Sequence, residues 1–151
     1  MKIAIVTGAS RGLGKNMAMK LAQSGVDVIL TYHSRKDEAD GVVAEIERSG
    51  RKALALQLDV SNSKSFAAFA SNVKQALKSK WDRDTFDFLV NNAGVALHVP
   101  VSEVSEEQFD QVMNVHLKGV LFLTQRLLPL IANGGRIVNI SSGLTRFSIP
   151  G

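Results

Sequence analysis

Three glycines near the N-terminus directly follow a short apolar run, and this arrangement restricts the fold more than any other feature of the 151-residue sequence. Residues 3–6 read Ile-Ala-Ile-Val, and Gly8, Gly12 and Gly14 follow with the spacing Gly-x-x-x-Gly-x-Gly. A short run that ends at a glycine is typical of a strand buried on both faces of a parallel sheet. Apolar residues at helical spacing come next, at Met17, Ala18, Leu21 and Ala22. We therefore predict a strand, a glycine-rich turn and a helix in direct succession.

A turn of this kind can hold a phosphate group. Glycines allow positive φ and let the backbone approach a ligand closely, and the free N–H groups at a helix start attract a pyrophosphate. The spacing differs from the Gly-x-Gly-x-x-Gly of larger dinucleotide-binding domains. Lys15 precedes Asn16, so the Gly-Lys-Ser/Thr ending of a triphosphate loop is absent. A turn that serves only tight helix–strand packing stays open as the alternative.

Four more apolar runs predict four more strands, separated by helices. We expect these strands at 26–32, 53–58, 86–90 and 136–141. We expect helices from the glycine turn to Gly25, at 37–49, after a cap at Ser61, and from Ser105 to about 131, with Gly134 and Gly135 ending the last one. The stretches 78–85 and 95–104 are interpreted as surface connections, the first with Trp81 partly packed. Strands that alternate with helices predict an α/β fold with a parallel sheet.

The end of the second predicted strand indicates which dinucleotide would bind there. Folds that bind NAD usually place Asp or Glu at this point, where it accepts hydrogen bonds from the ribose 2′-hydroxyl. Here residues 31–36 read Thr-Tyr-His-Ser-Arg-Lys, without an acidic residue. Hydroxyls and cations favour a 2′-phosphate, so we predict a preference for NADP(H). The residues concerned are Tyr32, Ser34, Arg35 and, from the glycine turn, Arg11. NAD(H) as cofactor, and Arg35 as the start of a solvated helix, stay open as alternatives.

Composition narrows the class of protein. Hydrophobic residues make up 45% and charged residues 21%, which is typical of a globular domain with one core. The sequence has no cysteine, which excludes disulfides and thiolate metal sites, and we predict no metal site. The net charge is +4, but its basic residues are scattered along the helices, so no nucleic-acid partner is expected. Because no apolar run has the length of a membrane span and no cleavable signal pattern is present, we expect no membrane partner and a cytoplasmic location.

Four ordered motifs resemble those of the short-chain dehydrogenase/reductase family. They are Thr-Gly-x-x-x-Gly-x-Gly at 7–14, Asn-Asn-Ala-Gly at 91–94, Asn114 within the last helix, and Asn-Ile-Ser-Ser ending at Ser142. The resemblance covers the entire chain. It implies an α/β fold of the Rossmann type, a doubly wound parallel sheet with strand order 3-2-1-4-5 that ends before a sixth strand. It also implies an oxidoreductase that transfers hydride between a nicotinamide and a small carbonyl or alcohol substrate.

The resemblance assigns roles at the cofactor. The glycine turn would hold the dinucleotide through Gly8, Ser10, Arg11, Gly12, Leu13 and Gly14. Asp59 would accept a hydrogen bond from the adenine amino group, and Val60 would offer backbone and apolar contact. Asn91 would be largely structural within the site, and the backbone of Ala93 and Gly94 would lie against the nicotinamide-side ribose. From the residues alone, Asp59 serving a helix start and residues 91–94 forming a simple turn stay open.

The resemblance also assigns catalytic roles. Asn114 would hold a water that passes protons to a lysine, and Ser142 would hydrogen-bond the substrate oxygen. Asn is a poor residue for a helix interior, which is consistent with a role beyond helix formation. A bond from Asn114 to a neighbouring loop stays open as the alternative. The glycine turn, Asp59, residues 91–94 and Ser142 all follow strand ends, where ligands bind in open parallel sheets.

The sequence departs from the family pattern after Ser142. In the family a Tyr transfers the proton, and a Lys in the motif Tyr-x-x-x-Lys lowers its pKa. Here the chain ends at Gly151, the only tyrosine is Tyr32, and no Tyr-x-x-x-Lys is present. We therefore expect residues 1–151 to form a single NAD(P)-binding Rossmann domain, incomplete at its C-terminus, that binds a cofactor weakly and turns over nothing alone. A non-catalytic dinucleotide-binding module and a methyl-donor-binding domain are the alternatives.

The last predicted helix suggests assembly. Apolar residues lie nearly all round it at 120–128, which is typical of a helix buried on more than one side. The fifth predicted strand would also have an open edge, which is a pairing hazard. We expect a homodimer or homotetramer in the complete protein.

Overall fold

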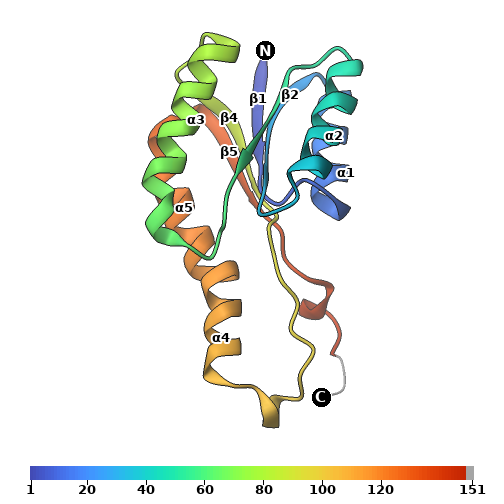
Figure 1. The fold of residues 1–151 in the computed structure, drawn as a ribbon, viewed down its shortest axis with the longest axis vertical. Helices are drawn as coiled ribbons and strands as arrows, with labels where there is room; N and C mark the ends of the chain where they lie inside the picture. Colours follow the sequence, from blue (N-terminus) through green and yellow to red (C-terminus); the bar gives the residue numbers. More distant parts are fainter. Residues whose placement is uncertain (149–151) are drawn as a thin grey trace.

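The computed structural model describes residues 1–148 and contains one five-stranded parallel sheet with helices on both faces (Figure 1). The strands are β1 Lys2–Val6, β2 Val26–Tyr32, β3 Ala53–Gln57, β4 Phe86–Asn91 and β5 Ile131–Asn139. They lie in the order β3-β2-β1-β4-β5, and every neighbouring pair is parallel. The predicted fold class and strand order are confirmed.

The helices form two layers around this sheet. They are α1 Gly12–Gln23, α2 Lys36–Arg48, α3 Phe66–Trp81, α4 Glu106–Met113 and α5 Val120–Leu127. Figure 1 shows α1 and α2 on one face and α3 and α5 on the other, while α4 projects beyond the edge at which the strands end. That edge is therefore flanked by loops from one side and by the α4–α5 arm from the other.

The strands need apolar side chains on both faces because helices cover both faces of the sheet. On β1, Ile3 and Ile5 belong to the cluster under α3 and α5, whereas Val6 belongs to the cluster under α1 and α2. All of these side chains are fully buried. A polar residue on either face of β1 would be buried in one of the two cores.

The region around Trp81 corrects the predicted surface connection at 78–85. Helix α3 continues to Trp81, whose side chain is buried and whose Nε1 donates a hydrogen bond to Asp27 Oδ2 at 2.8 Å. The same buried carboxylate accepts from the amide of Lys52 at 3.0 Å. The extra helical turn is therefore stabilised by a contact with β2 that lies far away in the sequence.

The predicted cap at Ser61 is wrong. The amide and hydroxyl of Ser61 both donate to Asp59 Oδ1, at 2.9 and 2.7 Å, and a 3₁₀ turn at Ser63–Ser65 leads into α3. Ser61 therefore completes a turn around Asp59 and does not serve the helix.

The long C-terminal helix is confirmed at its start and corrected at its end. Ser105 forms a reciprocal capping box with Gln108, as expected for this spacing. The helical run then passes through a π-helical segment at Asn114–Gly119 before α5 and ends in a 3₁₀ turn at Leu128–Leu130. Gly134 and Gly135 lie within β5 and not at the helix end. A side chain at Gly135 would meet the carbonyl oxygen of Asp87 at 2.7 Å, so the glycine serves close strand pairing.

The expected second apolar face of this helix is exposed. Leu123 and Leu127 are buried against the sheet, whereas Leu121, Phe122 and Leu128 are exposed. Strand β5 lies at the edge of the sheet and is largely exposed, and it ends at Asn139, two residues before the predicted position. Both surfaces that the sequence predicted to be uncovered are uncovered in residues 1–148.

A buried carboxylate joins the amino ends of β1 and β4. Asp87 accepts from Lys2 Nζ at 2.8 Å, from the Ile3 amide at 2.9 Å and from Arg83 Nη1 at 3.0 Å. Burial by itself raises the pKa of Asp87, but the hydrogen bonds from Lys2, Ile3 and Arg83 outweigh it and leave the pKa below its ordinary value. Such a group contributes stability above its unfolded-state pKa of about 4, and this stability is lost as the pH falls through the lowered folded value.

We therefore expect Asp87→Asn to lower the free energy of unfolding by about 1–3 kcal/mol at neutral pH. The difference from the wild type should shrink as the pH falls below about 4 and through the lowered folded-state pKa of Asp87, because the wild-type carboxyl then becomes protonated too. Urea unfolding at both pH values checks this. Asp84→Asn, at an exposed neighbour, is the matched control and should change little. A difference that is the same at both pH values would contradict the role given to the Asp87 charge.

Candidate functional site

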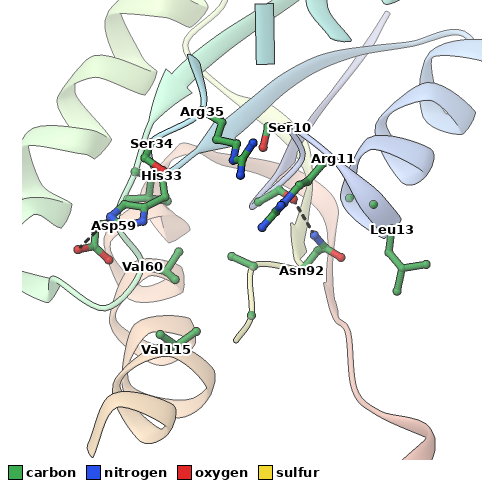
Figure 2. A pocket seen from close by; sticks show the side chains of 16 residues that line it. Ser10, Arg11, Leu13, His33, Ser34, Arg35, Asp59, Val60, Asn92 and Val115 are labelled. Carbon is green, nitrogen blue, oxygen red and sulfur yellow. Dashed lines mark hydrogen bonds and ion pairs between the residues drawn. The ribbon is translucent and has the colours of Figure 1, made fainter. Parts of the chain in front are cut away.

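A cavity of about 480 Å³ lies where the strands end at the loop-flanked edge of the sheet (Figure 2). Its size falls within the range of small-molecule sites. It is built by the β1–α1 turn, by the loops after β2 and β3, by the segment after β4 and by one residue of the π-helical segment. The lining residues are Gly8, Ser10, Arg11, Gly12, Leu13, Gly14, His33, Ser34, Arg35, Leu58, Asp59, Val60, Asn92, Ala93, Gly94 and Val115.

The glycine turn packs directly against the segment after β4. A Cβ at Gly8 would lie 2.8 Å from Ala93 Cα, and Gly8 has a φ of +63°, in the left-handed region. A Cβ at Gly14 would overlap the Gly8 carbonyl oxygen and the Asn92 side-chain amide. Both positions therefore exclude a side chain, Gly8 also through its backbone conformation.

Hydrogen bonds hold this contact in one arrangement. The Thr7 hydroxyl accepts from the amides of Asn92 at 2.9 Å and Ala93 at 3.0 Å. The side chain of Asn92 donates as well, from Nδ2 to the carbonyls of Thr7 at 2.9 Å and Gly8 at 3.2 Å. On its other side the turn is tied to β2, because the Gly8 amide donates to Thr31 Oγ1 at 3.1 Å. The turn is thus fixed from both neighbouring strands.

The start of α1 is left free for an anion. No side chain caps the helix at Arg11, and its first turn holds no acidic residue. Unpaired N–H groups and the positive end of the helix dipole attract phosphate. Arg11 adds a full charge: among residues 1–148 no carboxylate forms a salt bridge with it. This end of the cavity therefore suits a negatively charged group.

The loops after β2 and β3 carry the other charges of the cavity. Figure 2 shows the guanidinium groups of Arg35 and Arg11 pointing into it, with His33 and Asp59 together on one side. Arg35 is also paired with Glu38 Oε1 at 2.8 Å. The His33 ring lies 3.8 Å from Asp59, measured between Nε2 and Oδ2.

Asp59 is held as an ionised acceptor. Burial raises its pKa, but the hydrogen bonds from the Ser61 hydroxyl and amide, together with the nearby His33, lower it below its ordinary value. These hydrogen bonds occupy Oδ1. Since α3 begins only at Phe66, Asp59 does not serve a helix start, and its Oδ2 faces the His33 ring at 3.8 Å.

All but two of the cofactor residues predicted from sequence line this cavity. The structure does not bring Tyr32 or Asn91 into it. The Tyr32 side chain packs against the apolar cluster under α1 and α2. Asn91 is buried, and its Nδ2 donates to Asn139 Oδ1 at 2.8 Å and Thr124 Oγ1 at 3.2 Å, which ties β4 to β5 and α5. Asn91 instead lines a second cavity, of about 570 Å³, which lies between α5 and β5.

The two predicted catalytic residues lie outside the first cavity. Asn114 begins the π-helical segment, whose next residue, Val115, does reach the cavity. Ser142 follows β5 at the same edge of the sheet, and its Oγ accepts from the Leu144 amide at 3.2 Å at the start of a 3₁₀ turn, Gly143–Thr145. Residues 1–148 thus do not assemble these two side chains with the cofactor residues in one pocket.

Four lining residues were not predicted: His33, Leu58, Asn92 and Val115. Asn92 lies inside a motif that the sequence analysis used, and each of the other three is a direct neighbour of a predicted residue. Val115 had no sequence signal, because the π-helical segment that directs it here depends on packing. A side chain at the nearby Gly119 would overlap the Val60 carbonyl oxygen, which shows how closely this helix approaches the loop after β3.

Two further observations concern other kinds of site. Within the part of the chain that the structure describes, no three His, Asp or Glu residues gather as metal ligands would. In that same part, none of the helices combines the length and apolar character that a bilayer crossing needs.

Comparison with known proteins gives a consistent result. A family model described as short chain dehydrogenase matches residues 2–151. An uncharacterized oxidoreductase of Methylorubrum extorquens is 40% identical over 149 residues, which are 99% of this chain and 58% of that protein. The tetrahydroxynaphthalene reductase PfmaG of Pestalotiopsis fici is 36% identical, over 93% of this chain and 49% of its own length.

Solved structures agree with this. The landomycin C-6 ketoreductase LanV, with bound NADP and rabelomycin, has a TM-score of 0.94 and 38% identity, over 99% of this chain and 61% of that one. A short chain dehydrogenase of Burkholderia cenocepacia in complex with NADP has a TM-score of 0.88 and 35% identity, over 99% of this chain and 59% of that one. The chain thus spans less than two thirds of the length of these proteins.

The packing of the turn can be tested with two glycines. Gly14→Ala should lower the free energy of unfolding by about 1–3 kcal/mol, because the new methyl group overlaps backbone that cannot move easily. Gly41→Ala is the matched control: this glycine lies inside α2 with open space around it, so alanine should be neutral or stabilise by up to about 1 kcal/mol. Urea unfolding of both variants checks this, and equal stability of the two would contradict the proposed packing.

Proposed function

Because the chain belongs to the short chain dehydrogenase family, we propose that it binds NADP(H) and functions in an oxidoreductase that transfers hydride between a nicotinamide and a carbonyl or alcohol carbon. The observation that carries the proposal is the cavity in which the glycine turn, the uncapped start of α1 and two arginines meet. This arrangement fits a dinucleotide that bears an additional phosphate.

The pyrophosphate would lie on the glycine turn. The backbone at Gly12–Gly14 and the first N–H groups of α1 offer unpaired donors, and no acidic side chain opposes an anion there. The glycines would let the ligand approach the main chain, because no Cβ stands between them. Ser10 and Leu13 would border this contact from the same turn.

The adenosine end would lie between the loops after β2 and β3. Asp59 is ionised and has a free oxygen, so it would accept from the adenine amino group, and Val60 would contact the ring. Arg11, Arg35 and Ser34 would surround the 2′-phosphate. The absence of an acidic side chain at the end of β2 supports NADP(H) over NAD(H), as does the bound NADP of the similar structures LanV and the Burkholderia cenocepacia enzyme.

The nicotinamide end would lie toward Ala93 and Gly94, whose backbone lines the cavity. When bound, the nicotinamide supplies the hydride chemistry. We assign Ser142 to hydrogen bonding of the substrate oxygen and Asn114 to holding a water, in keeping with the family. Leu121, Phe122 and Leu128, which are exposed on the helix arm, are the surface through which we expect copies of the complete protein to associate.

The cofactor preference can be measured directly. Replacing both Arg11 and Arg35 by Ala should weaken NADPH binding by about ten- to hundredfold, since each removes a charge-assisted hydrogen bond to the 2′-phosphate. NADH binding should change by less than about threefold, because it lacks that phosphate. Isothermal titration calorimetry measures both. Arg126→Ala, an exposed arginine on α5, is the control. Equal losses for NADPH and NADH would contradict the assignment.

The 151 residues should bind the cofactor without turning it over. Their only tyrosine, Tyr32, lies outside the cavity, and the sequence holds no Tyr-x-x-x-Lys to supply the proton. We expect calorimetry to detect NADPH binding by the purified chain, while its NADPH absorbance stays constant over a panel of ketones and aldehydes. Turnover well above a buffer control would show that another group transfers the proton.

A further inference from the structure

Strand β5 contains an irregular stretch near the amino ends of the strands, on the opposite edge of the sheet from the cavity. The ladder between β4 and β5 is regular from Arg136 onward, but residues 132–135 have no partner on β4. They therefore form a bulge in an edge strand. Asn133 and Gly134 are both exposed in this bulge, so solvent reaches them and the pairing of a regular strand does not hold them.

The two exposed residues make the only Asn-Gly sequence in the chain. The backbone nitrogen of a glycine that follows asparagine can attack the asparagine side chain, because no Cβ hinders the approach and the glycine backbone adopts many angles. Gly134 has a φ of +77°, and a Cβ added to it would meet nothing within 4 Å. The surroundings of this dipeptide thus leave room for the ring that such an attack would close.

Arg136 places a positive charge at the same bulge. Its Nη1 donates to the carbonyl oxygen of Gly134 and, at 3.0 Å, to that of Gly135. The attacking nitrogen of Gly134 must lose its proton, and a cation held at the same residue stabilises the negative charge that develops there. Within residues 1–148 no carboxylate forms a salt bridge with Arg136, so its charge is not neutralised.

We propose that Asn133 is a site of spontaneous deamidation in the folded protein. The Gly134 nitrogen gives its proton to solvent and attacks Asn133 Cγ. The bond from Cγ to the side-chain nitrogen breaks, and this nitrogen takes up a proton and leaves as ammonia. Water then opens the resulting succinimide at either carbonyl, which yields aspartate or isoaspartate. The modified chain gains a negative charge, and the isoaspartate form has an additional methylene group in its main chain.

A second dipeptide shows why the backbone, and not the sequence alone, controls this reaction. Asp40 and Gly41 lie inside α2. In an α-helix each amide donates to the carbonyl four residues earlier, so the Gly41 nitrogen is held in a hydrogen bond. The helix must open locally before that nitrogen can attack the side chain before it. An Asn-Gly pair at this position would therefore be protected, whereas the pair in the bulge is not.

The experiment uses Asp40→Asn, which places a second Asn-Gly pair in α2 and removes only an exposed ion pair with Lys36. The chain is incubated at mildly alkaline pH, and peptide mapping by mass spectrometry measures deamidation at both positions in the same molecules. We expect position 133 to react at least about tenfold faster than position 40, because the helix must open first. In urea, where both pairs are unfolded, the two rates should agree within about threefold.

Asn133→Gln is the matched control for the wild type, because the longer side chain closes the corresponding ring much more slowly. The wild type should shift toward acidic forms on isoelectric focusing, and methylation by a methyltransferase specific for L-isoaspartate should increase in parallel. Asn133→Gln should remove most of both changes.

Equal rates at positions 133 and 40 in the folded chain would overturn the inference, as would a difference that persists unchanged in urea. An Asn133 that stays intact in the folded wild type but reacts in urea would overturn it too. None of these measurements involves a dinucleotide, so their failure leaves the proposed function intact.

Discussion

The site depends on one close approach: the turn after β1 lies on the backbone of the segment after β4, with no side chain between them. Gly8 would clash with Ala93 and Gly14 with Asn92 if either carried a Cβ. Asn92 donates two hydrogen bonds to Thr7 across the same contact, from its amide to the hydroxyl and from its side chain to the carbonyl, and these bonds fix the register. Asn92 therefore fixes the position of the turn. The start of α1 has no capping side chain, and this uncapped helix end is the feature that suits a phosphate.

The electrostatics of the cavity follow from which loops meet there. Parallel strands bring their carboxyl ends to one edge, so charges that are far apart in sequence become neighbours. Two arginines, Arg11 and Arg35, line the same cavity as the ionised carboxylate of Asp59, which its turn with Ser61 holds in place. The two guanidinium groups and the uncapped start of α1 make this cavity suitable for an anion.

Much of the fold could be predicted from the amino-acid sequence. The apolar runs located all five strands, the glycine spacing located the turn, and the capping pattern at Ser105 located the start of the long helix. The errors arose where distant contacts override local pattern. Trp81 extends α3 because Asp27 on β2 accepts its N–H. Gly134 and Gly135 suggested a helix end, yet they belong to β5, where close pairing with β4 leaves no room for a side chain at Gly135.

What the sequence determined by itself is therefore the set of local elements and the chemistry available at their ends, because strand periodicity and glycine conformation depend on a few neighbouring residues. Tertiary structure decided which of those groups share a cavity. It directed Asn91 toward Asn139 and Thr124 and packed the half-buried Tyr32 against the apolar cluster under α1 and α2. It also brought His33 and Val115 to the cavity from two different parts of the chain. The direction in which a side chain points at the end of a strand depends on the partners that the opposite loop supplies, and no local pattern contains that information.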